Sequence, residues 1–168
     1  MFNSGQNGAY TIDGQGDGQA DPAIITPDAD YAISGAGGPA QNLGAFSGTL
    51  HMPPFISLIE PVPEINQMGL PEITIDTKAN VKFKWEGSSN GYVKITISGS
   101  DSSVECIARD DGELTVPASV MSGLTLGQVS FFNIVNLERT TYGTMSGPGL
   151  VNPQVSSMMT TMVNAKAP

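Results

Sequence analysis

The strongest constraint on the fold is an alternation of apolar and polar residues between Val81 and Val116. Apolar side chains recur at every second position in four short runs, at 81–85, 93–97, 104–108 and 114–116. Side chains on a β-strand point to opposite faces with a period of two, so each run predicts a strand with one buried face. Asn90-Gly91 and Asp111-Gly112 are favourable for tight turns, and we expect a hairpin at each.

Two residues in these runs have the phase of core side chains. Trp85 shares the phase of Val81 and Phe83, which predicts that it is buried between two sheets. Cys106 also has an inward phase and is expected to act as a small core residue. It is the only cysteine, so no intrachain disulfide can form.

The remaining sequence predicts further short strands and one short helix. Proline-bounded segments at 45–50 and 55–59 are expected at a sheet edge or at a crossing between sheets. Residues 117–124 predict a helix of about two turns, with proline at its start. The other expected features are strands at 73–75 and 154–163, a hairpin of 129–137 with 140–145 that turns at Glu138-Arg139, and a solvated turn at Asp110-Asp111.

These elements together predict an all-β protein. Eight to ten short strands with turn signals between them are typical of an antiparallel, immunoglobulin-like β-sandwich, which we assign to residues 43–168. Residues 1–42 are rich in Gly and Asp and have only short apolar islands, at 10–12, 23–25 and 31–33. We therefore expect them to form an irregular N-terminal arm.

The net charge of −9 comes entirely from the N-terminal part of the chain. Residues 1–77 contain nine acidic residues and no Lys or Arg, whereas residues 78–168 contain seven of each sign. Such a surface repels phosphate groups, so we expect no nucleic acid partner and no association with anionic membranes. No apolar run is long enough for a membrane helix, so membrane insertion is not expected either.

The composition favours an extracellular protein. Only 14% of the residues are charged, and Ser, Thr, Asn and Gly are abundant. The first residues lack the basic and apolar regions of a signal peptide. We expect a secreted or cell-surface protein, either exported by another route or numbered from a point after a removed segment.

An acidic, Gly-rich segment near the N-terminus is the sharpest chemical signal. Oxygen-bearing residues alternate here with glycine or alanine, as a loop that wraps Ca²⁺ requires, and the predicted ligands are Asp13, Gln15, Asp17, Gln19 and Asp21. Residues 13–27 resemble one calcium loop of the FG-GAP family or of dockerins. The resemblance implies carboxylate ligands at Asp13, Asp17 and Asp21 and a backbone carbonyl ligand at Gln19, while Gln15 departs from the usual Asp or Asn. The alternative is a flexible acidic loop without metal.

A second resemblance covers about three-quarters of the chain. The features that carry it are Ser34–Gly38, Gly44–Ser47, Pro53–Pro61, the strand at Trp85, Val93–Ile95, Cys106, and the segment from Gly112 to Val120. In this order they resemble a pattern in uncharacterised secreted bacterial proteins. The resemblance implies an exported, immunoglobulin-like domain without enzymatic activity.

The sequence contains no recognisable catalytic motif. His51 is the only histidine, so neither a zinc site with Cys106 nor an acid–base pair is indicated by spacing, and a structural histidine at a strand end is expected. No nucleophile-elbow, metalloprotease, P-loop or dinucleotide-binding motif is present. We therefore expect a protein that is not an enzyme.

Four methionines concentrate in the C-terminal region, namely Met145, Met158, Met159 and Met162. Methionine fills irregular gaps in cores and also forms adaptable contact surfaces. Core filling is the expectation here, with a contact surface as the alternative.

Two functions fit the sequence. The first is a structural or adhesive module, such as a filament subunit, whose arm at 1–42 adds a strand to the open edge of a copy of itself or of another surface protein, at 45–50 or 55–59. The second is a calcium-dependent carbohydrate-binding module. Coplanar exposure of the four tyrosines, Tyr10, Tyr31, Tyr92 and Tyr142, would favour the second function.

Overall fold

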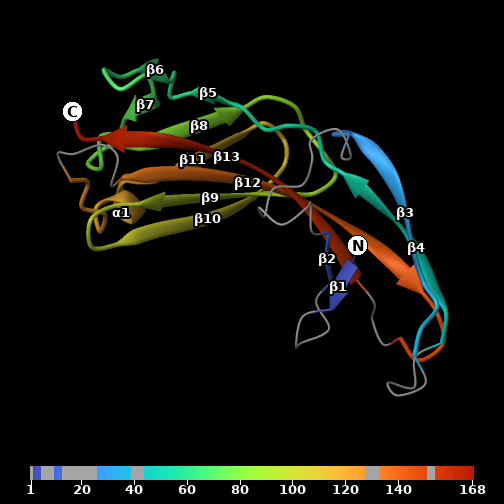
Figure 1. Cartoon of the computed structure of the whole chain (residues 1–168). Coiled ribbons are helices and arrows are strands. Elements are labelled where there is room, and N and C mark those ends of the chain that lie inside the picture. Colours follow the sequence, from blue (N-terminus) through green and yellow to red (C-terminus); the bar gives the residue numbers. More distant parts are fainter. Residues whose placement is uncertain (1, 5–9, 13–25, 39–43, 128–132, 151–153) are drawn as a thin grey trace.

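The fold is seen in a computed structural model that describes residues 2–4, 10–12, 26–38, 44–127, 133–150 and 154–168, with side chains from residue 26 onward (Figure 1). Within this part of the chain the elements are β1 Phe2–Ser4, β2 Tyr10–Ile12, β3 Ala29–Gly35, β4 Phe46–Met52, β5 Leu58–Glu60, β6 Glu64–Ile65, β7 Pro71–Thr74, β8 Val81–Trp85, β9 Tyr92–Ser98, β10 Ser103–Arg109, β11 Glu113–Val116, α1 Ala118–Met121, β12 Ile134–Ser146 and β13 Gln154–Lys166. The predicted all-β class is confirmed.

The strands form two main sheets. The large sheet has the order β10-β9-β12-β13-β7-β6, with β4 and then β3 added beside the far part of β12. The small sheet has the order β11-β8-β5. These ladders are antiparallel, as predicted, except that β13 pairs with β7 in parallel over Asn164–Lys166. β1 and β2 pair separately as an antiparallel hairpin.

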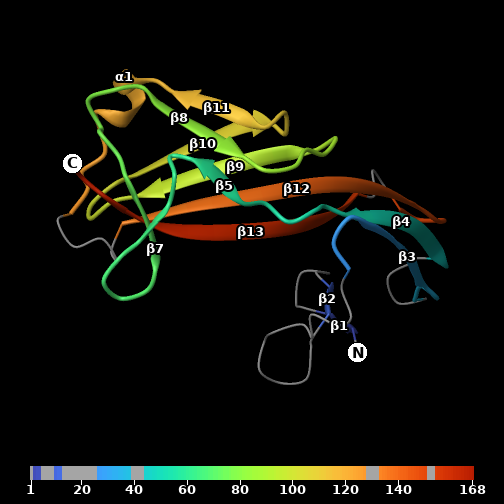
Figure 2. The same cartoon turned by 90° about the horizontal axis from the view of Figure 1, so that it is seen from above.

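The main hydrophobic core lies between the two sheets, which face one another in Figure 2. The small sheet contributes Leu58, Phe83 and Trp85 to it, and Trp85 is only 3% exposed, so its predicted burial is confirmed. Cys106 packs against this core and is partly buried, as its phase indicated. Burial raises the pKa of its thiol, with a smaller contribution from the charge of Glu105, which disfavours the reactive thiolate.

The long hairpin of β12 and β13 extends beyond the small sheet and divides the molecule into two regions (Figure 1). Residues 134–140 of β12 pair with β9, and residues 144–146 pair with β4. We call the part built from both sheets the two-layered region. The part built from β3, β4 and the adjoining ends of β12 and β13 is called the extension.

The continuity of β12 corrects one prediction. A turn at Glu138-Arg139 was expected, but both residues lie inside β12 and pair with β9 on one side and β13 on the other. The period-two pattern in fact continues through this point, because Val135, Leu137 and Arg139 all face inward and are buried. The turn was predicted because a charged residue such as arginine is rarely buried unless it is paired.

The predicted hairpins at Asn90-Gly91 and Asp111-Gly112 are also wrong. β8 and β11 pair with each other in the small sheet, and β9 and β10 pair with each other in the large sheet. Both glycine-containing loops therefore cross between sheets. Gly91 does not adopt a positive φ, and glycine is needed there because a Cβ atom would collide with the carbonyl oxygen of Thr140 on β12.

The predicted strand at 45–50 is present as β4, but it is not an edge. It pairs with β3 on one side, through Leu50 and Tyr31 among others, and with β12 on the other side. Part of the predicted arm, residues 29–35, thus joins the large sheet of its own chain. The segment at 55–59 does end in an edge strand, because β5 pairs only with β8 in the small sheet.

Candidate interaction surface

A buried ion pair holds β12 in the two-layered region. Nε of Arg139 lies 2.7 Å from Oδ2 of Asp110, and both side chains are fully buried. The indole Nε1 of Trp85 donates a hydrogen bond of 2.7 Å to Oδ1 of the same carboxylate. Asp110 was expected to be a solvated turn residue, and this is wrong because its carboxylate accepts from two buried donors.

Arg139 also ties two loops to the large sheet. Its Nη1 donates to the carbonyl oxygens of Pro54 and Phe55, and its Nη2 donates to that of Glu86 at 2.8 Å. The guanidinium is enclosed by main-chain and carboxylate oxygens, and its two Nη groups together donate to four of them. This arrangement positions loops and leaves the guanidinium no exposed surface for a substrate, so we assign it a structural role.

His51 joins β3 to β4 in the extension. Its Nδ1 lies 2.8 Å from Asp30 and its Nε2 lies 3.3 Å from Asp28. The hydroxyls of Thr141 and Ser157 donate to the backbone oxygen of His51, not to the imidazole. No nucleophile–base pair results, and the expected structural role of a histidine near a strand end fits this geometry.

The predicted calcium ligands Asp13, Gln15, Asp17, Gln19 and Asp21 lie outside the described residues. Within the described part of the chain, no group of three or more His, Cys, Asp or Glu side chains is arranged to hold a metal ion.

The outer face of the large sheet, which points away from the small sheet, carries several exposed apolar side chains. We call them the outer-face patch; each is between 47% and 65% exposed, and they are Tyr92, Ile107, Tyr142, Met158 and Met162. Strand register places them on one face: Thr140 of β12 lies between Tyr92 and Met158, and Tyr142 follows two residues later on β12. The patch thus spans β10, β9, β12 and β13.

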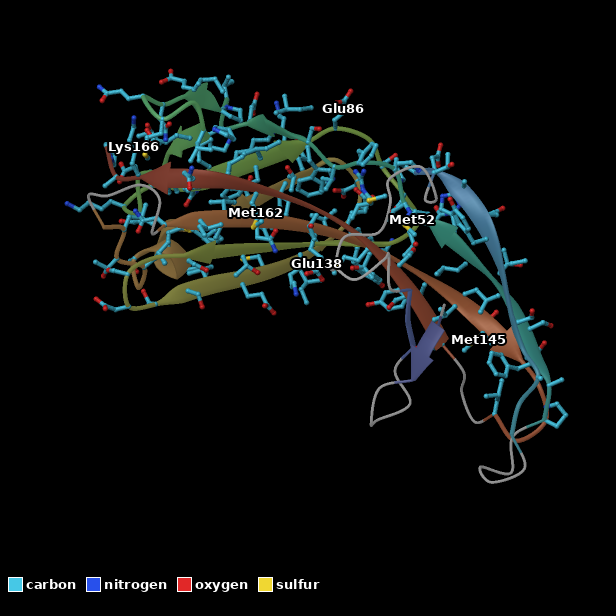
Figure 3. All side chains as sticks on the ribbon, in the orientation of Figure 1. Met52, Glu86, Glu138, Met145, Met162 and Lys166 are labelled. Carbon is cyan, nitrogen blue, oxygen red and sulfur yellow. The ribbon has the colours of Figure 1, made fainter. Side chains whose placement is uncertain are left out.

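An ion pair lies in the middle of the patch. Lys94 on β9 faces Glu138 on β12, with 3.1 Å between Nζ and Oε2, and Ile107 is the cross-strand neighbour of Lys94. The hydrogen bond that Lys94 donates to Glu138, and then the charge of Glu138, raise the pKa of Lys94, with smaller contributions from Glu105 and Tyr142. The two charges compensate each other, so the centre of the patch is close to neutral. Glu138 lies over the two-layered region, whereas Met145 lies in the extension (Figure 3).

Core filling is wrong for two of the four methionines. Met158 and Met162 have the outward phase of β13 and are 52% and 63% exposed, while Met145 and Met159 face inward and are half-buried. The signal was available in the sequence, because the inward residues Val163 and Ala165 fix the phase of β13. The phase of Val93, Ile95 and Ile97 similarly places Tyr92 outside.

The tyrosines divide between different sites. Tyr92 and Tyr142 are both exposed on the outer face. Tyr31 is half-buried on β3, where its hydroxyl donates to the backbone oxygen of Thr26. The side chain of Tyr10 lies outside the described residues. Of the three tyrosines whose side chains the structure describes, Tyr92 and Tyr142 are therefore available for a common surface.

Comparison with known proteins found no family model, no curated protein and no solved structure that matches this chain. In the described residues, no helix has the length and apolar character needed to cross a membrane. The function of this chain is therefore inferred from its own geometry.

Proposed function

We propose that this chain is a non-catalytic structural or adhesive module of the cell surface or extracellular space, which associates with copies of itself or with other surface proteins. The outer-face patch carries the proposal. Its five apolar side chains lie on one face across four neighbouring strands, while a well-formed core already exists on the opposite face of the same strands. Clustered exposed apolar side chains on a folded domain are typical of interaction sites.

The composition of the patch supports a protein partner. Tyrosine and methionine are enriched in protein interfaces, whereas charged residues are depleted at their centres. Lys94 and Glu138 already compensate each other, so a partner does not need to neutralise them. Flexible methionine side chains such as Met158 and Met162 adapt to an opposing surface.

The same proposal extends to the finer fold and to the N-terminal residues. The two facing sheets, the buried Trp85 and the loops that cross between sheets support an immunoglobulin-like β-sandwich, which here lacks a disulfide and carries an extension.

We propose that residues preceding β3 act as an arm and that Asp13, Gln15, Asp17, Gln19 and Asp21 bind Ca²⁺. Saturable heat of calcium binding that Asp17→Ala abolishes would support the metal site, and its absence at millimolar calcium would exclude it.

The proposal is tested by light scattering on the full chain from micromolar to near-millimolar concentration. We expect the mean mass to rise with concentration above the 17.5 kDa of one chain. The triple variant Tyr92→Thr, Ile107→Thr, Tyr142→Thr should associate less while keeping the wild-type melting temperature, because all three side chains are exposed. A mass that stays at one chain at every concentration would contradict self-association.

A carbohydrate-binding module is the second candidate. Tyr92 and Tyr142 are exposed on one face of adjacent strands, and aromatic rings in such positions can stack on sugars. Retention on insoluble polysaccharides, lost in Tyr92→Ala and Tyr142→Ala, would favour this function. Equal retention of the two variants and the wild type would exclude this site.

A further inference from the structure

We infer that the free edge of β13, from Gln154 to Val163, pairs in antiparallel fashion with the same edge of a second copy of this chain. The inference rests on the proposed function and assigns the contact to one strand. β12 lies beside β13 from Gln154 to Asn164, and β7 lies on the other side only at 164–166. Among the described residues, no strand occupies the outer side of β13 between Gln154 and Val163.

Such an edge exposes a row of main-chain donors and acceptors. Proteins usually protect long edges with charged side chains, prolines or bulges, because an unprotected edge recruits another strand. The sequence of this edge is Gln-Val-Ser-Ser-Met-Met-Thr-Thr-Met-Val, without a charge or a proline. Five of its ten residues are Val or Met and two are Thr, and an uncharged segment of this kind is typical of strands that pair readily.

The other edges of the two main sheets are protected. Each terminal strand carries at least one charged residue: Glu105 and Arg109 on β10, Glu64 on β6, Asp30 on β3, Glu113 on β11 and Glu60 on β5. β13 between Gln154 and Val163 is therefore the exception in both length and chemistry. Unlike the terminal strands, this segment has no charged side chain that would discourage pairing with another strand.

A second copy of β13 is the partner that fits this edge. Residues 154–163 carry no charge, so pairing two copies of this edge places no like charges opposite each other. Antiparallel pairing of a strand with itself is two-fold symmetric and closes as a dimer. Both large sheets would then form one continuous sheet.

The methionines indicate the register. Even-numbered residues of β13 face outward, so a two-fold axis at Thr160 keeps the outer faces of both copies on one side. Met158 then lies opposite Met162 of the second copy, and Met162 opposite its Met158. Both methionine side chains are more than half exposed in the single chain, and each becomes covered by a methionine across the axis.

The experiment compares three full-length proteins by light scattering and sedimentation equilibrium. The wild type should form a dimer of twice the 17.5 kDa chain mass. Thr160→Lys places two ammonium groups opposite each other at the axis, and dimerisation should weaken about tenfold or more. The matched control is Ser103→Lys, an exposed residue on the charged edge of β10, and it should dimerise like the wild type.

Cross-linking tests the register directly. With Cys106 replaced by alanine, Thr160→Cys should form a disulfide-linked dimer under mild oxidation, whereas Ser156→Cys should not, because only residue 160 lies opposite itself. Folding of each variant is checked by the fluorescence of Trp85, which lies in the core of the two-layered region.

The outcomes separate this inference from the proposed function. Association that Thr160→Lys leaves unchanged and that the Tyr92, Ile107 and Tyr142 triple variant abolishes would overturn the edge contact and support the outer-face patch. A wild type that remains monomeric throughout would overturn the edge contact and self-association through the outer-face patch, and would leave other surface proteins as the partners of the patch. Loss of dimer in Thr160→Lys with efficient cross-linking of Thr160→Cys would establish the edge contact.

Discussion

The two-layered region and the extension share two strands but are stabilised differently. In the two-layered region β12 and β13 lie under a second sheet, and Val135, Leu137 and Val163 are buried. Among the described residues of the extension no second sheet is present, and Leu50, at 9% exposure, is the only hydrophobic side chain that is buried. The other inward-facing hydrophobic side chains of the extension are half-buried, namely Tyr31, Ile33, Phe46, Met145 and Val155.

The comparison shows that strand pairing and core burial are separable in this protein. One β-hairpin continues through both regions with unbroken register, from Ile134–Asn164 to Thr144–Gln154. Only the first of the two regions gains a full apolar core from it. We therefore expect the two-layered region to set the global stability and the extension to open locally at lower free energy.

The largest expected effect comes from breaking the buried ion pair of the two-layered region. Arg139→Met leaves the buried carboxylate of Asp110 without its guanidinium partner, and we expect a loss of about 3–5 kcal/mol in the free energy of unfolding. Urea unfolding followed by Trp85 fluorescence measures this. Lys94→Met is the control, because it removes a partly exposed ion pair on the outer face, which is worth about 0–1 kcal/mol. Equal losses in both variants would contradict the assigned role of Arg139.

The second effect tests the close contact between the β8–β9 crossing and β12. In Gly91→Ala the added Cβ collides with the carbonyl oxygen of Thr140, and the resulting displacement should cost about 1–3 kcal/mol. Gly123→Ala is the matched control, since nothing lies within 4 Å of its added Cβ and its φ is not positive. The control should unfold at or slightly above the wild-type midpoint. A tolerated Gly91→Ala would show that the contact is not tight.

The third effect concerns the junction of the extension. Thr141→Val removes one of two hydroxyls that donate to the backbone oxygen of His51, and it should cost about 1 kcal/mol. We expect hydrogen exchange to become faster in β3 and β4 but to stay unchanged in β8 and β9. Uniform acceleration across the chain would mean that the extension and the two-layered region unfold as one unit.

The smallest effect is a pH dependence within the small sheet. The hydrogen bond from Lys82, and then its charge, lower the pKa of Glu113 below its ordinary value of 4.5. A carboxyl with a lowered folded pKa stabilises the protein above its unfolded pKa, and this contribution is lost as the pH falls through the folded value. Glu113→Gln should therefore slightly reduce the drop in melting temperature below about pH 4.5. The effect is small because the side chains of Lys82 and Glu113 are both exposed to solvent. An unchanged acid dependence would show that the pair is fully screened.

Local sequence determined the strands. The period-two patterns at 81–85, 93–97, 104–108 and 114–116 predicted β8 to β11, and the same reasoning placed Trp85 inside. It also predicted a helix of about two turns at 117–124, of which one turn forms, at Ala118–Met121. These features follow from the alternation of side chains and from the φ preference of proline, which depend on neighbours in the sequence.

The partners of the strands were decided by tertiary structure. Asn90-Gly91 has the composition of a hairpin turn, but the core required β8 and β9 to lie in opposite sheets, and Gly91 serves a close contact with Thr140. Arg139 looked like a turn residue because its partners Asp110, Pro54 and Phe55 lie 29, 85 and 84 residues away in the sequence. The edge of β13 is open because β7 pairs with only its last three residues, and this pairing depends on a contact between strands that are distant in the sequence. Sequence periodicity therefore shows which face of a strand is buried, whereas only packing decides which strand, and which edge, lies beside it.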